Sequence, residues 1–184
     1  MKLLFYLATV TLAFSASSVA ADLTAEVPKG DPEFTAKAMS AAQRISGRMP
    51  QSLGYREGFK LTPIKTGTNG WTCAVGPGGP WCADAAGLEW FRAISTKAEP
   101  PDKTGFVYMF AGDTGTSNHD PYATDKSHWV RTGPHVMIVG KAAHEMAAGY
   151  PNTMDPNPKQ PYVMYPGTKY EHLMFPADTA GHSQ

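Results

Sequence analysis

The segment GPHVMIVG at residues 133–140 is partly repeated by KYEHLMF at residues 169–175. In both segments a histidine, an apolar residue, a methionine and a second apolar residue follow in the same order. Their β-branched, methionine and aromatic content favours β-strands. On a strand, residues i and i+2 face the same way, so each segment would present its histidine and its methionine together.

Working outward from these segments, the sequence predicts three helices. The first begins at Asp31, an N-cap acceptor followed by a proline, and carries an apolar stripe to Met49. The second covers Asp84 to about Lys97, and a short third covers residues 141–148. The predicted strands are residues 71–75, 105–111, 128–131, 134–139, 161–165 and 171–175. We expect an α+β fold: a single domain with a mixed or antiparallel sheet, two or three flanking helices and one disulfide.

The N-terminus has the three parts of an export signal. Lys2 gives a positive start, residues 3–14 form an apolar core, and residues 18–20 offer the small-x-small pattern of a cleavage site. The apolar core is about a dozen residues long, whereas a bilayer span needs roughly 20. We expect a signal peptide at residues 1–20, cleaved near Ala20, then a flexible lead-in at 21–30 and the domain at 31–184. The expected location is periplasmic or secreted.

The charge balance limits the partners. Once Lys2 leaves with the signal peptide, fifteen basic side chains face sixteen acidic ones. Such a chain has no broad positive field to attract nucleic acid or an anionic membrane. No later apolar run approaches the length of a membrane span. We therefore expect no nucleic-acid partner and no membrane span in the mature chain, and consider a small molecule or a metal ion as the partner.

The chain has two cysteines, Cys73 and Cys82, which are close in sequence. In an oxidising compartment a lone nearby pair usually forms a disulfide. The GPGGP stretch at residues 76–80 can turn the chain and bring them together. A thiolate metal site is the alternative, but it lacks a Cys-x-x-Cys spacing. The sequence therefore predicts a disulfide around a glycine- and proline-rich loop at one side of the domain.

If the two histidine strands lie side by side, two imidazoles and two thioethers can meet on one face. The residues concerned are His135, Met137, His172 and Met174. Imidazole and thioether ligands favour a soft or borderline metal, above all Cu(I), and zinc is also possible. The alternative is core packing, in which the methionines fill an irregular interior and each histidine bonds a backbone carbonyl. The leading hypothesis is a binding module for a copper-like metal or a small ligand.

Two further functions stay open, so the sequence does not decide whether the protein is an enzyme. A metal-independent hydrolase or lyase could use His135 or His172 as general base, with Glu171 or Asp113 nearby. Asp113 opens an Asp-Thr-Gly motif, which is similar to the active-site loop of aspartic proteases, but the chain has one such motif where the mechanism needs two carboxylates, so the sequence favours a polar turn. The long polar loop that follows it is where a site rim is expected. The last alternative is a structural envelope domain without a site.

Four segments of the chain carry a resemblance to a known group of sequences. They are NGWTC at 69–73, GFVYM at 105–109, GPHVMI at 133–138 and PGTKYEHLM at 166–174. With them the chain resembles a group of exported bacterial proteins that has no established activity. The resemblance spans roughly residues 69–176. It implies export and a single domain, and it implies nothing about mechanism.

Overall fold

The computed structural model describes residues 32–40, 52–57, 60–65 and 68–177. The helices are α1 (Pro32–Ser40), α2 (Ala85–Thr96), α3 (Lys141–Met146) and the 3-10 turn η1 (Ala147–Gly149). The strands are β1 (Ser52–Glu57), β2 (Lys60–Lys65), β3 (Thr72–Gly76), β4 (Gly79–Ala83), β5 (Thr104–Met109), β6 (Thr116–Ser117), β7 (Trp129–Val130), β8 (His135–Gly140), β9 (Tyr162–Met164) and β10 (His172–Pro176). The expected α+β class is confirmed.

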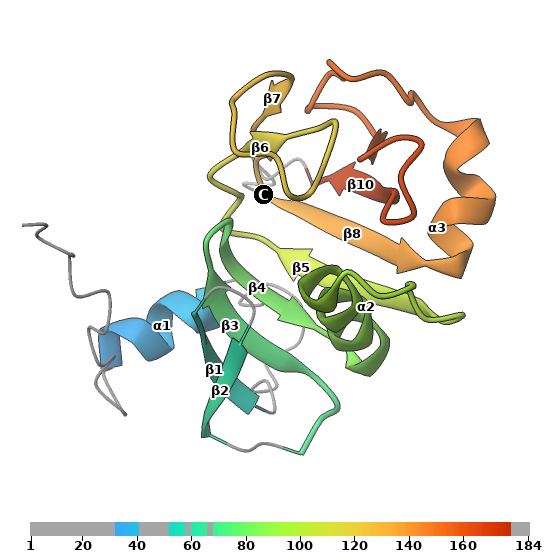
Figure 1. Ribbon diagram of the computed structural model, residues 1–184. Coiled ribbons are helices and arrows are strands. Elements are labelled where there is room, and N and C mark those ends of the chain that lie inside the picture. Colours follow the sequence, from blue (N-terminus) through green and yellow to red (C-terminus); the bar gives the residue numbers. More distant parts are fainter. Residues whose placement is uncertain (1–31, 41–51, 58–59, 66–67, 178–184) are drawn as a thin grey trace, which may run out of the picture.

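The main sheet holds eight strands in the order β2-β1-β3-β4-β5-β8-β10-β9 (Figure 1). Every neighbouring pair is antiparallel except β1 and β3. β6 and β7 form a separate two-stranded sheet, so the predicted strand at 128–131 does not join the main one. Within the described residues, no helix is long and apolar enough to cross a membrane.

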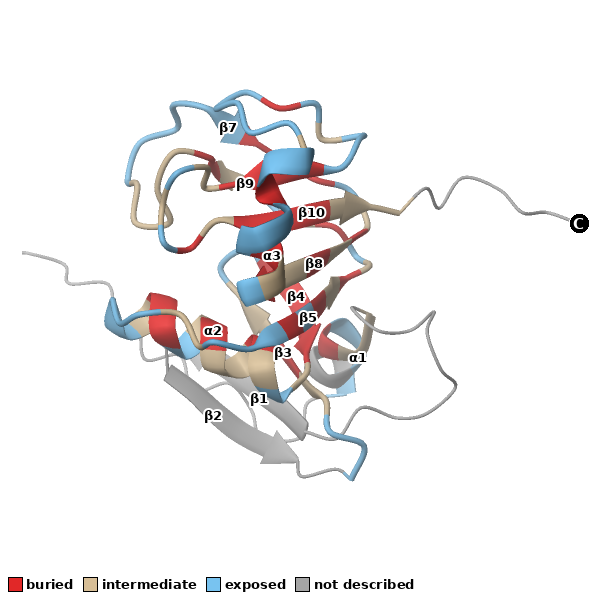
Figure 2. Ribbon diagram, turned by 90° about the vertical axis from the view of Figure 1, so that its right-hand side faces the viewer, coloured by how far each residue is buried: buried red, intermediate tan, exposed pale blue. Residues whose placement is uncertain are grey.

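Helices cover both faces of the sheet (Figures 1 and 2). α2 packs on one face, where its Trp90 and Ile94 join Val107 and Met137 in the largest apolar cluster. α1 and α3 lie on the other face: Ala38 of α1 packs near the disulfide, and α3 packs on β8 and β10. Because successive strand residues alternate between the faces, a single strand contributes side chains to the apolar clusters on both faces of the sheet.

The second helix forms where its capping signals predict it. The Asp84 carboxylate accepts a hydrogen bond from the Gly87 amide at 2.7 Å, which satisfies one of the free N–H groups of the first turn. Lys97 ends the helix in the left-handed conformation at φ 58°. The first helix is confirmed over Pro32–Ser40, whereas its predicted continuation to Met49 lies outside the described residues.

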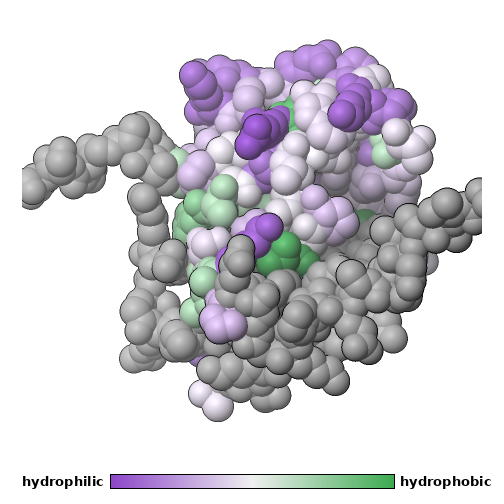
Figure 3. Space-filling model, turned by 90° about the vertical axis from the view of Figure 1, so that its left-hand side faces the viewer, coloured by the Kyte–Doolittle hydropathy of each residue, from purple (hydrophilic) through white to green (hydrophobic). Residues whose placement is uncertain are grey.

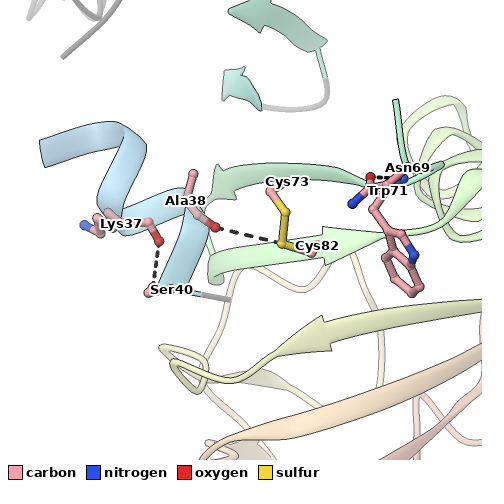
Figure 4. Close-up of a disulfide and its surroundings, with 7 residues drawn as sticks. All are labelled: Lys37, Ala38, Ser40, Asn69, Trp71, Cys73 and Cys82. Carbon is pink, nitrogen blue, oxygen red and sulfur yellow. Dashed lines mark hydrogen bonds between the residues drawn. A yellow bond between two sulfur atoms is a disulfide. The ribbon is translucent and has the colours of Figure 1, made fainter. Parts of the chain in front are cut away.

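The disulfide is confirmed, but its surroundings correct the predicted loop. Cys73 and Cys82 lie directly opposite each other on paired strands β3 and β4, with 4.0 Å between their Cα atoms (Figure 4). Gly79 and Pro80, which the sequence placed in a loop, open strand β4. Glycine and proline are depleted in strands, and this hid β4 from sequence analysis. The sulfur of Cys82 lies 3.9 Å from the Ala38 carbonyl oxygen, so α1 covers the bond.

Reducing this bond should lower the free energy of unfolding by about 2–3 kcal/mol, because a cross-link restricts the unfolded chain. The cysteines are nine residues apart, and a disulfide that closes so short a loop stabilises the folded protein less than one that closes a long loop. Urea denaturation of one preparation, with and without reductant, measures the difference by tryptophan fluorescence. The Cys73→Ala/Cys82→Ala variant is the control, and reductant should leave its midpoint unchanged. An equal shift in the variant would contradict the prediction.

Gly105 lets α2 lie directly on β5. A Cβ atom there would stand 2.7 Å from the Ala86 carbonyl carbon and 2.8 Å from the Gly87 Cα, both helix backbone. We expect Gly105→Ala to destabilise the protein by about 2 kcal/mol or more, since a helix backbone cannot yield as a side chain does. Gly149→Ala is the matched control, because its Cβ would meet nothing within 4 Å. Similar denaturation midpoints for the two variants would disprove this account of the helix contact.

Candidate functional site

The register between β8 and β10 brings the two histidine strands together. Met137 lies directly opposite Met174, and each histidine lies two residues before the methionine of its own strand. Residues directly opposite, and residues two apart on one strand, share a face of the sheet. His135, Met137, His172 and Met174 therefore lie on one face. The histidines are not opposite each other, because Pro176 takes the place across from His135.

The flanking strands add two more methionines to this face. Met109 of β5 lies opposite His135, and Met164 of β9 lies opposite His172. We call the resulting set the His–Met face: Met109, His135, Met137, Met164, His172 and Met174. Sequence analysis assigned Met164 only to a strand and gave Met109 no role. The two strands have similar endings, VYM at 107–109 and YVM at 162–164. This similarity is the sequence signal that could have pointed to Met109 and Met164.

The His–Met face has an approximate two-fold symmetry. In the strand order β5-β8-β10-β9, an axis through the Met137–Met174 pair exchanges β8 with β10 and β5 with β9. It also exchanges the opposed pair Met109–His135 with the opposed pair Met164–His172. The sequence echo between residues 133–140 and 169–175 is therefore also a spatial repeat.

A cavity of about 420 Å³ lies over this face, and all six of its residues line it. α2 contributes Trp90 and Ile94 to the walls, β4 contributes Trp81, and the loop after β5 contributes Asp113. Trp129 also lines the cavity and is 45% exposed, which places it at the opening. The volume falls within the range of small-molecule sites, and the lining is mainly apolar with few polar groups, as in such sites.

The hydropathy of the molecular surface changes from the upper to the lower part of the molecule. On the face in Figure 3, the upper part, which carries β6 and β7, is mainly hydrophilic. Hydrophobic residues come to the surface below it. A mainly hydrophilic region therefore borders a more hydrophobic one on this face.

The two imidazoles make the same kind of hydrogen bond through Nδ1. Nδ1 of His135 donates to the Gly133 carbonyl at 2.6 Å, and Nδ1 of His172 donates to the Tyr170 carbonyl at 3.0 Å. A neutral imidazole that donates from Nδ1 carries its lone pair on Nε2. These carbonyl bonds are the ones that the core-packing alternative predicted, but they use only one nitrogen of each ring. Nε2 of His135 is buried and has no hydrogen-bond partner.

Burial keeps both imidazoles neutral. Loss of hydration lowers the pKa of His135, and it lowers the pKa of His172 to about 4, with a smaller contribution from the nearby His135. Asp113 responds in the opposite direction, because burial raises the pKa of its carboxyl group. The Asp113 carboxylate accepts hydrogen bonds from the amides of Gly115 at 2.9 Å and Thr132 at 3.0 Å, which hold it at the cavity wall.

Two indole groups of the cavity wall also carry buried, unpaired atoms. The Nε1–H groups of Trp81 and Trp90 have no hydrogen-bond partner. A buried polar group without a partner costs about 1–3 kcal/mol. The cavity residues thus hold two unpaired donors and one unpaired acceptor, a combination that favours a bound partner over plain packing.

The other candidate residues lie elsewhere. Glu171 does not line the cavity: its carboxylate accepts from the Gly167 amide at 3.0 Å and pairs with Nδ1 of His144. His119 and His128 lie outside the cavity, with ring centroids 5.9 Å apart. Among the candidate catalytic residues, His135, His172 and Asp113 line the same cavity, and Glu171 does not.

The ligand types present restrict the metals that fit. In the described ranges there is no group of three or more histidine, cysteine, aspartate or glutamate side chains able to hold a metal ion. A zinc site built from nitrogen and carboxylate ligands therefore has no basis in this part of the chain. A metal bound at the His–Met face would depend on thioether sulfur.

Comparisons with protein-family models, curated proteins and solved structures found no match to this chain.

The burial of His172 predicts that stability falls as the pH falls. In the unfolded chain its imidazole takes up a proton near pH 6.5, whereas in the folded protein it does so only near pH 4. Between these values the unfolded state binds more protons, so acid favours unfolding. We expect a loss of about 2 kcal/mol between pH 7 and pH 5, which urea denaturation at several pH values measures. The His172→Gln variant should lose the part of this dependence that His172 contributes, and an unchanged slope would refute the assignment.

Proposed function

We propose that this protein is a binding module that holds a metal ion or a small molecule in the cavity over the His–Met face. Its contacts would come from His135, Met137, His172 and Met174. The observation that carries the proposal is the buried Nε2 of His135, a free lone pair on a cavity-lining residue. A metal ion and a hydrogen-bond donor can both use such a lone pair.

We further propose that the module is exported and that residues 1–20 are removed near Ala20. The composition of that segment is typical of a signal peptide. The Cys73–Cys82 disulfide agrees with it, because disulfides persist in oxidising compartments.

The cost of the unpaired atoms favours a binding site over a purely structural domain. At about 1–3 kcal/mol each, three unpaired groups are a large share of the stability of a domain of this size. An envelope domain without a ligand would gain by replacing them with apolar side chains. A ligand that pairs with them recovers part of the cost on binding.

A metal-independent hydrolase or lyase is the second candidate. It is supported by His135 and Asp113, which share the cavity and have pKa values displaced toward each other. His135 would be the general base. Among the described residues, the cavity lining includes no serine, cysteine or lysine, so three of the common nucleophiles are missing from this part of the lining. This candidate ranks second because a base alone does not define a reaction.

Phenol is a suitable probe for the cavity, because it joins an apolar ring to one O–H donor. We expect it to bind the wild-type protein and to bind the His135→Phe variant about tenfold more weakly, since phenylalanine keeps the ring and removes the Nε2 acceptor. Saturation-transfer NMR and calorimetry measure the affinity. The control is His144→Phe, the same substitution at a histidine whose side chain is 75% exposed.

Native mass spectrometry of the protein from a periplasmic extract is the companion measurement. A retained mass that the His135→Phe variant loses would support the proposal. The absence of any retained ligand, together with phenol affinities that are equal in the three proteins, would contradict it.

A further inference from the structure

We infer that the ligand is Cu(I) and that each half of the His–Met face binds one ion through one imidazole nitrogen and two thioether sulfurs. The first set of ligands is Met109, His135 and Met137; the second is Met164, His172 and Met174. The inference rests on the proposed function, since the ion must enter the cavity, and it names the ligand and the stoichiometry.

The strand registers bring three donors together in each half. In the first half, Met109 is directly across from His135, and Met137 is two residues along the strand from it. Directly opposed residues have Cβ atoms about 5 Å apart, and residues two apart on a strand are separated by about 7 Å. Methionine has three rotatable bonds, so both sulfurs can turn toward the imidazole Nε2. The second half repeats this arrangement around His172.

The same registers separate the two imidazoles, which argues for two ions and not one. Leu173 lies opposite Ile138, so His172 lies beside Val139, four residues along β8 from His135. Four residues along a strand and one strand across give roughly 14 Å between the Cα atoms. An imidazole reaches a metal about 6–7 Å from its own Cα. A single ion placed between the two imidazoles would lie at or beyond the distance that either ring nitrogen can reach. Each imidazole has two methionine sulfurs close by instead.

The donor chemistry selects a soft, low-coordinate ion. Thioether sulfur and imidazole nitrogen suit Cu(I), while Mg²⁺, Ca²⁺ and Mn²⁺ require oxygen ligands. Among the described residues of the lining, Asp113 is the only carboxylate, and its Oδ1 accepts hydrogen bonds from two backbone amides. Neither half therefore offers the oxygen ligands or the third nitrogen that a harder ion needs.

The surroundings of the rings prepare them for a metal. A ligating histidine usually donates its other ring nitrogen to a carbonyl or carboxylate, which fixes the tautomer and the ring orientation. Both histidines do so, with the Gly133 and Tyr170 carbonyls as acceptors. His172 is also held edge-on by Trp90, with ring centroids 4.8 Å apart. No proton has to leave a neutral imidazole before it binds an ion.

Anaerobic titration with Cu(I) against a colorimetric Cu(I) chelator tests the stoichiometry. We expect two equivalents for the wild-type protein and, by X-ray absorption, one nitrogen and two sulfurs around each ion. Met109→Leu/Met137→Leu should lose one equivalent, because leucine keeps the volume and removes the sulfur. Met164→Leu/Met174→Leu should lose the other. The control variant carries the same two substitutions at Met146 and Met154, which are 40% and 39% exposed, and should keep both equivalents.

The outcomes separate this inference from the proposed function. Phenol binding without Cu(I) binding would overturn the inference and leave the cavity as a small-molecule site. A single equivalent that either pair of leucine substitutions abolishes would overturn it in favour of one shared site. Two equivalents that survive both pairs would place the copper elsewhere and overturn it as well. A protein that binds neither phenol nor Cu(I), and retains no ligand from the periplasm, would defeat both proposals.

Discussion

The antiparallel pairing of β8 with β10 determines which of their residues share a face of the sheet. Because the side-chain period of a strand is two, a shift of one residue would turn His172 and Met174 to the opposite face. The observed register is also supported from the far side of the sheet, where Leu173 and Val163 pack beneath α3. The burial of ordinary apolar residues on one face thus sets the position of the polar and sulfur groups on the other.

The walls of the cavity are tied to this sheet through the backbone. The loop after β5 is fixed at two points: the Asp113 amide donates to the Thr132 carbonyl, and the Thr114 amide donates to the Gly78 carbonyl of the disulfide hairpin. Thr132 precedes β8, so one short segment positions both Asp113 and His135. The hairpin that carries Trp81 is closed by the Cys73–Cys82 bond. Fixed walls lower the entropic cost of holding a ligand.

The sequence predicted where helices and strands form better than it predicted which of them lie side by side in the fold. α2 could be placed because its signals, Asp84 at the start and the apolar spacing that follows, act within a few residues. β8 and β10 could be placed for the same reason. β4 was missed since Gly79 and Pro80 are poor strand formers, and here hydrogen bonds to β3 and the disulfide override their propensity.

Met109 could not be assigned to the site, because it meets His135 only through a pairing between strands distant in the chain. Glu171 follows Tyr170 and precedes His172, yet it faces His144, since alternate residues point to opposite sides.

A lining of thioethers also makes the cavity sensitive to oxidants. Oxidation of a methionine sulfur replaces a soft, apolar group with a polar sulfoxide that is a poor ligand and a poor neighbour in a core. The four methionines of the His–Met face are only 2–7% exposed, whereas Met146 and Met154 lie on the surface. Oxidants in the surrounding compartment therefore meet surface methionines first. A ligand seated over the face would protect the buried sulfurs further, so occupancy and the chemical lifetime of the site are physically linked.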